Sequence, residues 1–305
     1  MLFLLTGCAG LTPIPQPELA DLPDETRAQV ELGRTLFFDA GLSGDGTLSC
    51  ASCHDPKQYG ADGRTTSLGA GGEPIRRNAP SVFNAALKDF QFWDGRAATL
   101  EEQARGPLFA EVEMATTPEA VERYLGAMYA EAFGAAFPGE TGPTVDQLTR
   151  ALAAYERVLP APSRFDRFLE GEREVLTDLE RSGLRLFRNN CAFCHGGDGI
   201  GGDDFERLGD EIPWPNDRRQ DLGRAEVTGD AADELVFVVP SLRNVTQTGP
   251  YFHDGSVETI EEAVKLMGRH QIGRDFDDTE VNALVAFLAT LEAETIPPWA
   301  FAPEG

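Results

Sequence analysis

The sequence predicts a mostly α-helical protein composed of two tandem domains that are related by internal duplication. Three observations predict this fold class: one cysteine-containing motif occurs twice, several other segments recur at a constant spacing, and the apolar residues follow helical spacing with few strand patterns. The length of 305 residues allows one large or two medium domains, so it accommodates the duplication.

The composition limits the classes of partner. Asp and Glu number 51 against 26 Lys and Arg, which gives a formal net charge of −25 at pH 7. A general affinity for nucleic acid or for an anionic membrane requires basic surface, so we expect no nucleic-acid partner. Attraction to a basic protein is compatible with this charge. No run approaches the roughly 18 apolar residues that a membrane span needs.

A C-x-x-C-H motif occurs twice, as CASCH at Cys50–His54 and as CAFCH at Cys191–His195. This motif is typical of covalent attachment of haem c, because its two thiols add to the vinyl groups of haem and its histidine becomes the proximal iron ligand. The sequence therefore predicts two bound haem c groups in two cytochrome c-like domains. The expected thioether residues are Cys50, Cys53, Cys191 and Cys194, and the expected axial histidines are His54 and His195.

Three other interpretations of these cysteines are weaker. A zinc ribbon would place the two C-x-x-C pairs much closer together in the chain. A thioredoxin-like pair has no reason to be followed by histidine twice, and a disulfide framework is uncommon for four cysteines in so long a chain.

The fifth cysteine lies near the start of the sequence. Leu5–Cys8 resembles the lipobox of bacterial lipoproteins, although the apolar stretch before Cys8 is short and lacks basic residues. Because haem c is attached outside the cytoplasm, we expect a periplasmic protein that is lipidated at Cys8 and meets the membrane only through this anchor. A misassigned start or a merely hydrophobic stub is the alternative. The four prolines of residues 12–23 predict a tether.

Repeated segments define the predicted domains. Between residues 80 and 104, every repeated segment recurs 160 residues later without a gap, and a GRTLF/GLRLF pair further upstream recurs after 150 residues. We therefore expect a remnant signal and tether at 1–23, a first haem domain at 24–160 and a second at 161–305. The recurring pairs are Pro80–Asn84 with Pro240–Asn244, Phe92–Gly95 with Phe252–Gly255, and Thr99–Glu102 with Thr259–Glu262.

Helix-start signals agree with a mostly helical protein. Thr99 and Thr259, each with glutamate three residues later, predict capping boxes at equivalent places in the two domains. Thr144 with Gln147 predicts a further helix through residue 155, and Thr279 with Asn282 predicts one through residue 291. The single strand candidate is Leu235–Val239.

The duplication also suggests that the two irons differ. Met267 lies on the apolar face of an expected helix at 260–267 and is a candidate sixth ligand, although a core role is the alternative. The residue at the repeat-equivalent position is Pro107, which cannot bind iron. We therefore expect a six-coordinate second haem and an open first haem. His270 and, with less support, His253 are the rival ligands.

Several segments in combination resemble the bacterial dihaem cytochrome c peroxidases, over about residues 31–291. They are Leu42–His54, Asn78–Ser81, Phe92–Arg96, Glu113–Met114 and Pro250–Gly255.

The resemblance implies reduction of hydrogen peroxide to water with electrons from a small cytochrome c or cupredoxin. It implies that the first haem is the low-potential peroxide site and that the second, with Met267, is the high-potential haem at which electrons enter. It places Trp93 between the haems, Glu113 as the distal catalytic glutamate and Gln103 as a nearby distal glutamine. A positioned carboxylate suits the proton transfer that peroxide cleavage needs, whereas surface and core positions are the ordinary alternatives for Glu113 and Trp93.

The resemblance also implies a calcium ion, held by the Asn78 side chain and by the carbonyl oxygens of Thr248 and Pro250. Oxygen ligands suit calcium, and a turn-capping role is the alternative for Asn78.

One departure from the family pattern concerns activation. Many members carry a blocking histidine in the loop after the first haem motif, but residues 55–77 contain no histidine. Two other functions stay open: a dihaem oxidase that modifies a partner protein, as the related maturation enzymes do, and a passive dihaem electron carrier. Those maturation enzymes use tyrosine where this chain has Met267. Homodimer formation is also left open.

Overall fold

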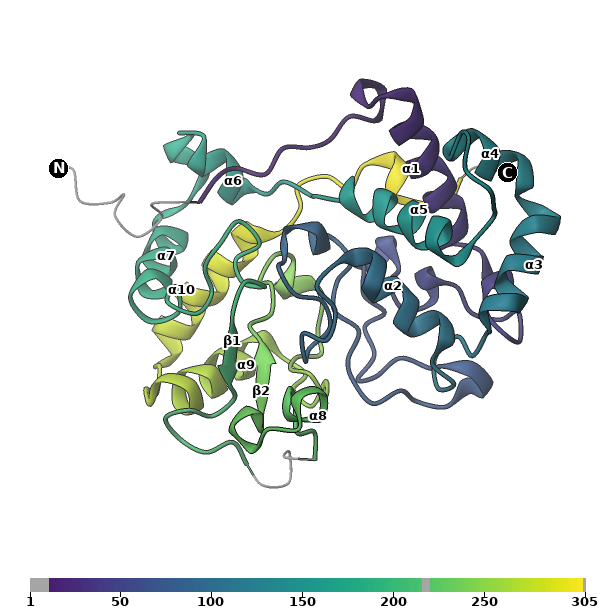
Figure 1. Cartoon of the computed structure of the whole chain (residues 1–305). Helices are drawn as coiled ribbons and strands as arrows, with labels where there is room; N and C mark the ends of the chain where they lie inside the picture. The colour runs from purple at the N-terminus through teal and green to yellow at the C-terminus, as the bar shows by residue number, and fades with distance from the viewer. Residues whose placement is uncertain (1–10, 216–219, 304–305) are drawn as a thin grey trace. The chain divides into compact units, whose positions relative to one another are not determined.

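The structure, a computed structural model, describes residues 11–215 and 220–303 (Figure 1). Most of its regular elements are helices, and the chain divides into two compact units. The N-terminal unit comprises residues 15–86, 99–161 and 296–303, and the C-terminal unit comprises residues 11–14, 87–98, 162–215 and 220–295. Among the described residues, no helix combines the length and apolar character of a membrane span. Cys8 lies outside the described residues.

The N-terminal unit is built around α1 and α5, which pack against each other, with α2 also against α5. The helix predicted from Thr144 is confirmed as α5: the Thr144 hydroxyl accepts from the backbone nitrogen of Gln147 at 3.2 Å, and the Gln147 side chain accepts from the Thr144 nitrogen at 3.1 Å. The helices are α1 (Asp24–Phe37), α2 (Leu100–Phe109), α3 (Pro118–Met128), α4 (Ala130–Ala136) and α5 (Val145–Arg157).

The C-terminal unit repeats this plan with α7 against α10 and adds one small sheet. Strands β1 and β2 pair antiparallel with Phe205 opposite Val238, which confirms the strand predicted at residues 235–239. The helices are α6 (Arg164–Leu169), α7 (Asp178–Asn190), α8 (Ala225–Thr228), α9 (Ile260–Leu266) and α10 (Asp278–Leu288), and the strands are β1 (Phe205–Arg207) and β2 (Val236–Val238).

The predicted cap of α10 was wrong by two residues. Asp277, not Thr279, is the capping residue: its carboxylate accepts from the Glu280 nitrogen at 2.9 Å, and the Glu280 carboxylate accepts from the Asp277 nitrogen at 3.3 Å. Both sequence pairs fit a capping pattern, and aspartate is the better N-cap residue.

The two main helix pairs cross at repeat-equivalent glycines. A Cβ atom added to Gly33 of α1 would lie 1.9 Å from the carbonyl oxygen of Ala151 in α5, and one added to Gly183 of α7 would lie 1.8 Å from that of Ala283 in α10. Only glycine permits such close backbone contact. The predicted duplication is therefore confirmed at the level of helix packing.

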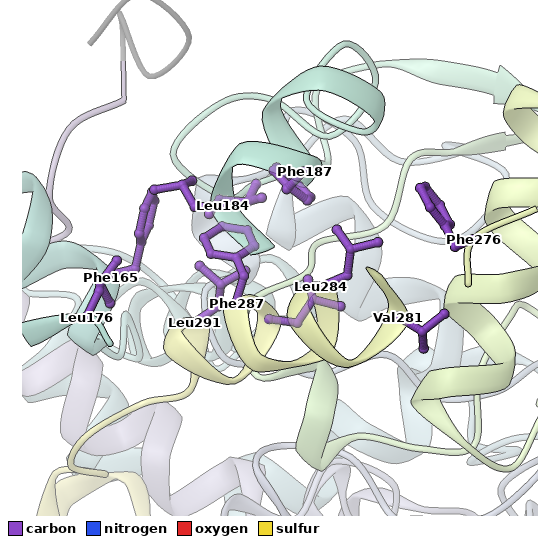
Figure 2. Packing of buried hydrophobic residues seen from close by; sticks show 11 residues of the cluster. Phe165, Leu176, Leu184, Phe187, Phe276, Val281, Leu284, Phe287 and Leu291 are labelled. Atoms are coloured by element: carbon purple, nitrogen blue, oxygen red, sulfur yellow. The ribbon is translucent and has the colours of Figure 1, made fainter. Parts of the chain in front are cut away.

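Buried side chains of α7 and α10 form the core of the C-terminal unit (Figure 2). Leu184 and Phe187 of α7 face Leu284 and Phe287 of α10, and the two phenylalanine rings lie 4.9 Å apart. Each such side chain contributes about 1.5–3 kcal/mol on full burial. This core supports the end of α7, directly before the Cys191–His195 loop.

The repeated F-x-D-G segments adopt the same turn. Phe92 and Phe252 both have positive φ, at 66° and 67°, and each turn is closed by a β-bridge between its flanking residues. Such φ values are rare for bulky residues, so their recurrence at a spacing of 160 residues is a second structural signature of the duplication.

Candidate haem sites

The two C-x-x-C-H segments fold into the same turn. In the N-terminal unit, the backbone nitrogen of His54 donates to the carbonyl oxygen of Cys50 at 2.9 Å, and in the C-terminal unit His195 donates to Cys191 at 2.9 Å. In each motif, one turn therefore runs from the first cysteine to the histidine.

The four thiols are free and poorly ionised. Burial raises the pKa of Cys50 and of Cys191 to about 12, and that of Cys194 to about 11, while the pKa of Cys53 is raised for the same reason. Throughout residues 11–215 and 220–303, no three His, Cys, Asp or Glu side chains gather in an arrangement that would hold a metal ion. Each motif therefore has two free thiols available for thioether bonds to haem.

The His195 ring is neutral, and the His54 ring contacts a backbone carbonyl. The Nδ1 atom of His54 lies 3.0 Å from the carbonyl oxygen of Pro80. Burial lowers the pKa of His195 to about 4, against the smaller opposing effect of the carbonyl of Pro240, the repeat equivalent of Pro80. A hydrogen bond from Nδ1 to a carbonyl leaves the Nε2 lone pair for a metal.

The distal residues predicted for the first haem lie in the N-terminal unit with it. Gln103 and Pro107 share a face of α2, and the chain after α2 folds back so that the Met114 nitrogen donates to the Pro107 carbonyl at 3.0 Å. Glu113 is half-buried. Burial is the main cause of the raised pKa of Cys53, and the charge of the Glu113 carboxylate is one of the smaller causes that raise it further. The structure therefore brings Glu113 close to the Cys50–His54 loop.

Met267 begins a π-helical turn, Met267–Gln271, that directly follows α9. Such turns are rare and occur often at functional sites.

The predicted Thr99 and Thr259 caps are confirmed by hydrogen bonds of 3.1 Å and 3.3 Å from the backbone nitrogens three residues later. Because both helices start in the same register, Pro107 and Met267 occupy equivalent helical positions.

The rival ligands have other packing partners. The buried His270 has Nδ1 at 3.0 Å from the Ile212 carbonyl oxygen, and its ring lies edge-on to Trp214. His253 is stacked on Phe237 with 4.3 Å between the ring centroids.

Trp93 belongs to the C-terminal unit, although it precedes α2 in the chain. Its carbonyl oxygen accepts from the Val238 nitrogen of β2 at 2.8 Å, and its ring lies edge-on to that of His253 at 6.4 Å. Trp93 and His253 are repeat-equivalent residues, so the two copies of the F-x-D-G turn place their variable residues against each other.

The residues predicted to hold calcium divide between the units. In the N-terminal unit, the Asn78 side-chain amide donates to the Arg64 carbonyl at 2.9 Å. Thr248 and Pro250 belong to the C-terminal unit, where Thr248 ends a short 3₁₀ turn.

Sequence reasoning missed a buried ion pair beside the second haem loop. Arg243 and Asp166 are joined by two hydrogen bonds of 2.9 Å and 3.0 Å, and their side chains are 1% and 3% exposed. The Arg243 Nε atom also donates to the Asp198 carbonyl at 2.7 Å, three residues after His195. The available signal was that Arg243 replaces Phe83 of the first repeat.

Comparison with known proteins gives a consistent result. Residues 27–174 match the family described as di-haem cytochrome c peroxidase, and residues 181–292 match cytochrome c. The cytochrome c551 peroxidase of Nitrosomonas europaea is 42% identical over 96% of this chain and 88% of its own. The methylamine utilization protein MauG of Methylophilus methylotrophus is 33% identical over 88% and 83%. The crystal structure of a MauG-like protein associated with microbial copper homeostasis superposes with a TM-score of 0.82, at 30% identity and 99% coverage of both chains.

The residues present fit two haem c groups, one in each unit. Each unit supplies two free thiols in one turn and a histidine at the end of that turn. The predicted haem cofactors therefore agree with both the local chemistry and the matched families.

Proposed function

The chain belongs to the dihaem cytochrome c peroxidase family, a family of enzymes, and we propose on this premise that it reduces hydrogen peroxide to water with electrons from a small redox protein. The haem held by Cys50–His54 is the proposed peroxide site, and the haem held by Cys191–His195 is the proposed site at which electrons enter. The observation that carries this assignment is the difference at one repeat-equivalent position, Pro107 in one unit and Met267 in the other.

The distal residues of the N-terminal unit carry the proposed chemistry. When bound, the first haem supplies an iron that takes the peroxide and the electrons that break its O–O bond. Glu113 takes the proton from the inner peroxide oxygen and delivers it to the outer oxygen, so that water leaves. Gln103, on the same side of α2 as Pro107, orients the peroxide by hydrogen bonding.

The C-terminal unit has the proposed electron-transfer role. Met267 is the proposed sixth iron ligand, a role favoured by its place at the start of the π-helical turn. Trp93, packed against His253, is the proposed aromatic relay between the haems. A calcium ion held by Asn78, Thr248 and Pro250 is part of the same proposal.

The proposed location is the periplasm, with a lipid anchor at Cys8. Covalent haem attachment outside the cytoplasm supports the compartment, and the lipobox-like Leu5–Cys8 sequence supports the anchor. The donor is then a periplasmic cytochrome c or cupredoxin.

The experiment that tests the proposed function is stopped-flow mixing of the all-ferric holoprotein with peroxide. Since residues 55–77 contain no histidine and Pro107 is no ligand, we expect one high-spin haem that reacts at once without prior reduction. Turnover with reduced cytochrome c should then follow. A protein that is low-spin at both haems and inert until one electron is added would contradict the open first haem.

Substitution of Met267 by alanine tests the second haem. We expect its low-spin spectrum to change and its reduction potential to fall, because a thioether ligand raises the potential of haem iron. Redox titration followed at both haem bands measures the effect, with Met128→Ala, an exposed methionine of α3, as control. An unchanged spectrum and midpoint would assign the ligand to His270 or His253 instead.

The second candidate function is oxidation of a partner protein. Similarity to MauG and to the MauG-like crystal structure favours it, whereas Met267 favours a conventional electron donor. Mass spectrometry of proteins incubated with the holoenzyme and peroxide distinguishes the two, because only an oxidase leaves a covalent change. A passive electron carrier would show neither peroxide turnover nor such a change.

A further inference from the structure

The second haem loop contains one aromatic side chain that is exposed to solvent. Phe193, between Cys191 and Cys194, is 95% exposed, more than any other large apolar side chain measured among the described residues. Single exposed apolar residues are ordinary, but a nearly fully exposed phenylalanine is not. The first haem loop has Ser52 at the same place, so the motif itself does not require an aromatic residue.

Several carboxylates lie beside the Cys194 end of this loop. The Glu206 carboxylate lies 3.6 Å from the Cys194 sulfur. Burial is the main cause of the raised pKa of Cys194, and the negative charges of Glu206, Asp204 and Asp210 raise it further. Asp203, whose pKa is raised by burial and then by its neighbours Asp89, Asp198 and Asp204, belongs to the same acidic surroundings.

One basic side chain whose charge acts on this loop is largely neutralised. Arg274, whose charge acts on Cys191, forms an ion pair with Glu280 and donates to the Asn190 side chain at 2.7 Å. The surface around Phe193 therefore combines an apolar centre with an acidic rim, which we call the Phe193 surface.

We propose that the Phe193 surface is the docking site of the electron donor, and that the donor is a small redox protein with an apolar patch ringed by lysines. This inference rests on the proposed function. A buried aromatic anchor within a polar rim is the usual anatomy of a protein interface. Complementary charge accelerates the encounter of the two proteins.

The charge of the chain argues against a second copy as the occupant. Two copies meeting through this surface would oppose acidic rims, and each carries a net charge of −25. Like charges facing each other across an interface are unfavourable. A basic partner gains from the same rim.

The test compares holoenzyme variants with a basic monohaem cytochrome c as donor. Phe193→Ser installs the residue of the first haem loop, and we expect the KM for reduced cytochrome c to rise roughly tenfold with little change in kcat, as for loss of an interface anchor. Glu206→Gln should weaken the fall of kcat/KM with added salt. Val227→Ser, an exposed apolar residue of α8 in the same unit, is the matched control and should change neither.

Two measurements separate this inference from the proposed function. The single-turnover reaction of Phe193→Ser with peroxide, and its haem spectrum, should match those of the unchanged protein. An unchanged KM in Phe193→Ser, or an unchanged salt dependence in Glu206→Gln, would overturn the inference. So would sedimentation that shows a dimer of the unchanged protein and a monomer of Phe193→Ser, because a second copy would then cover the ring. Failure of the unchanged enzyme to react with peroxide would instead overturn the proposed function.

Discussion

Replacing Glu113 by glutamine is expected to lower peroxide turnover by about 10²–10⁴-fold, the usual loss when a positioned proton-transfer group is removed. Glutamine keeps the size of the side chain and its capacity to hydrogen-bond, but it cannot move a proton from one peroxide oxygen to the other. Glu113 is half-buried, its charge acts on Cys53, and its backbone carbonyl accepts from the Ala70 nitrogen at 2.8 Å, so the loop that carries it is held in place.

The control for this variant is Glu111→Gln, because Glu111 is an exposed carboxylate two residues away in the same loop. Turnover of the control should be unchanged, and both variants should retain two attached haems by their absorption spectra. Near-normal turnover of Glu113→Gln would show that Glu113 is a surface residue without a catalytic role.

The duplicated architecture could be predicted from the sequence because each of its signals is local. The C-x-x-C-H motifs each lie within five residues, and the repeats align without a gap from residue 80 to residue 104. The upstream Gly33/Gly183 pair then proved to mark the helix crossings, where the backbone approach excludes a side chain. Capping at Thr144 was predictable for the same reason, since cap and partner are three residues apart.

Other features depend on contacts that no local pattern reveals. The cap of α10 is a different case, because Asp277 and Thr279 both offer local capping pairs and aspartate is the better N-cap residue. Arg243 and Asp166 are 77 residues apart in the sequence, and a charge at either position predicts only exposed surface. The assignment of Trp93 to the C-terminal unit likewise depends on its distant contact with β2.

Replacing Asp166 by alanine is expected to destabilise the C-terminal unit by about 3–5 kcal/mol, because it leaves the Arg243 guanidinium buried without its counter-charge. The same carboxylate also accepts hydrogen bonds from the backbone nitrogen of Ile14 at 3.1 Å and from the hydroxyl of Ser163 at 2.6 Å. Denaturant unfolding of the holoprotein, followed at the band of the second haem, measures the change. Asp278→Ala, which removes the exposed partner of Lys265, should cost far less, because an exposed ion pair contributes little to stability.

The difference in unfolding free energy between the unchanged protein and Asp166→Ala should decrease in acid. Burial alone would raise the pKa of Asp166, but hydrogen bonding and charge from Arg243 hold it below its usual value. A carboxyl with a lowered pKa stabilises the fold above its unfolded-state pKa of about 3.9, and this contribution is lost as the pH falls through the folded-state value. The difference should therefore be constant from neutral pH down to about pH 5 and shrink only in stronger acid. Two results would contradict this role of the Asp166–Arg243 pair in supporting the second haem loop. One is a free-energy difference that shrinks between pH 8 and pH 6, and the other is a cost of Asp166→Ala below about 1 kcal/mol.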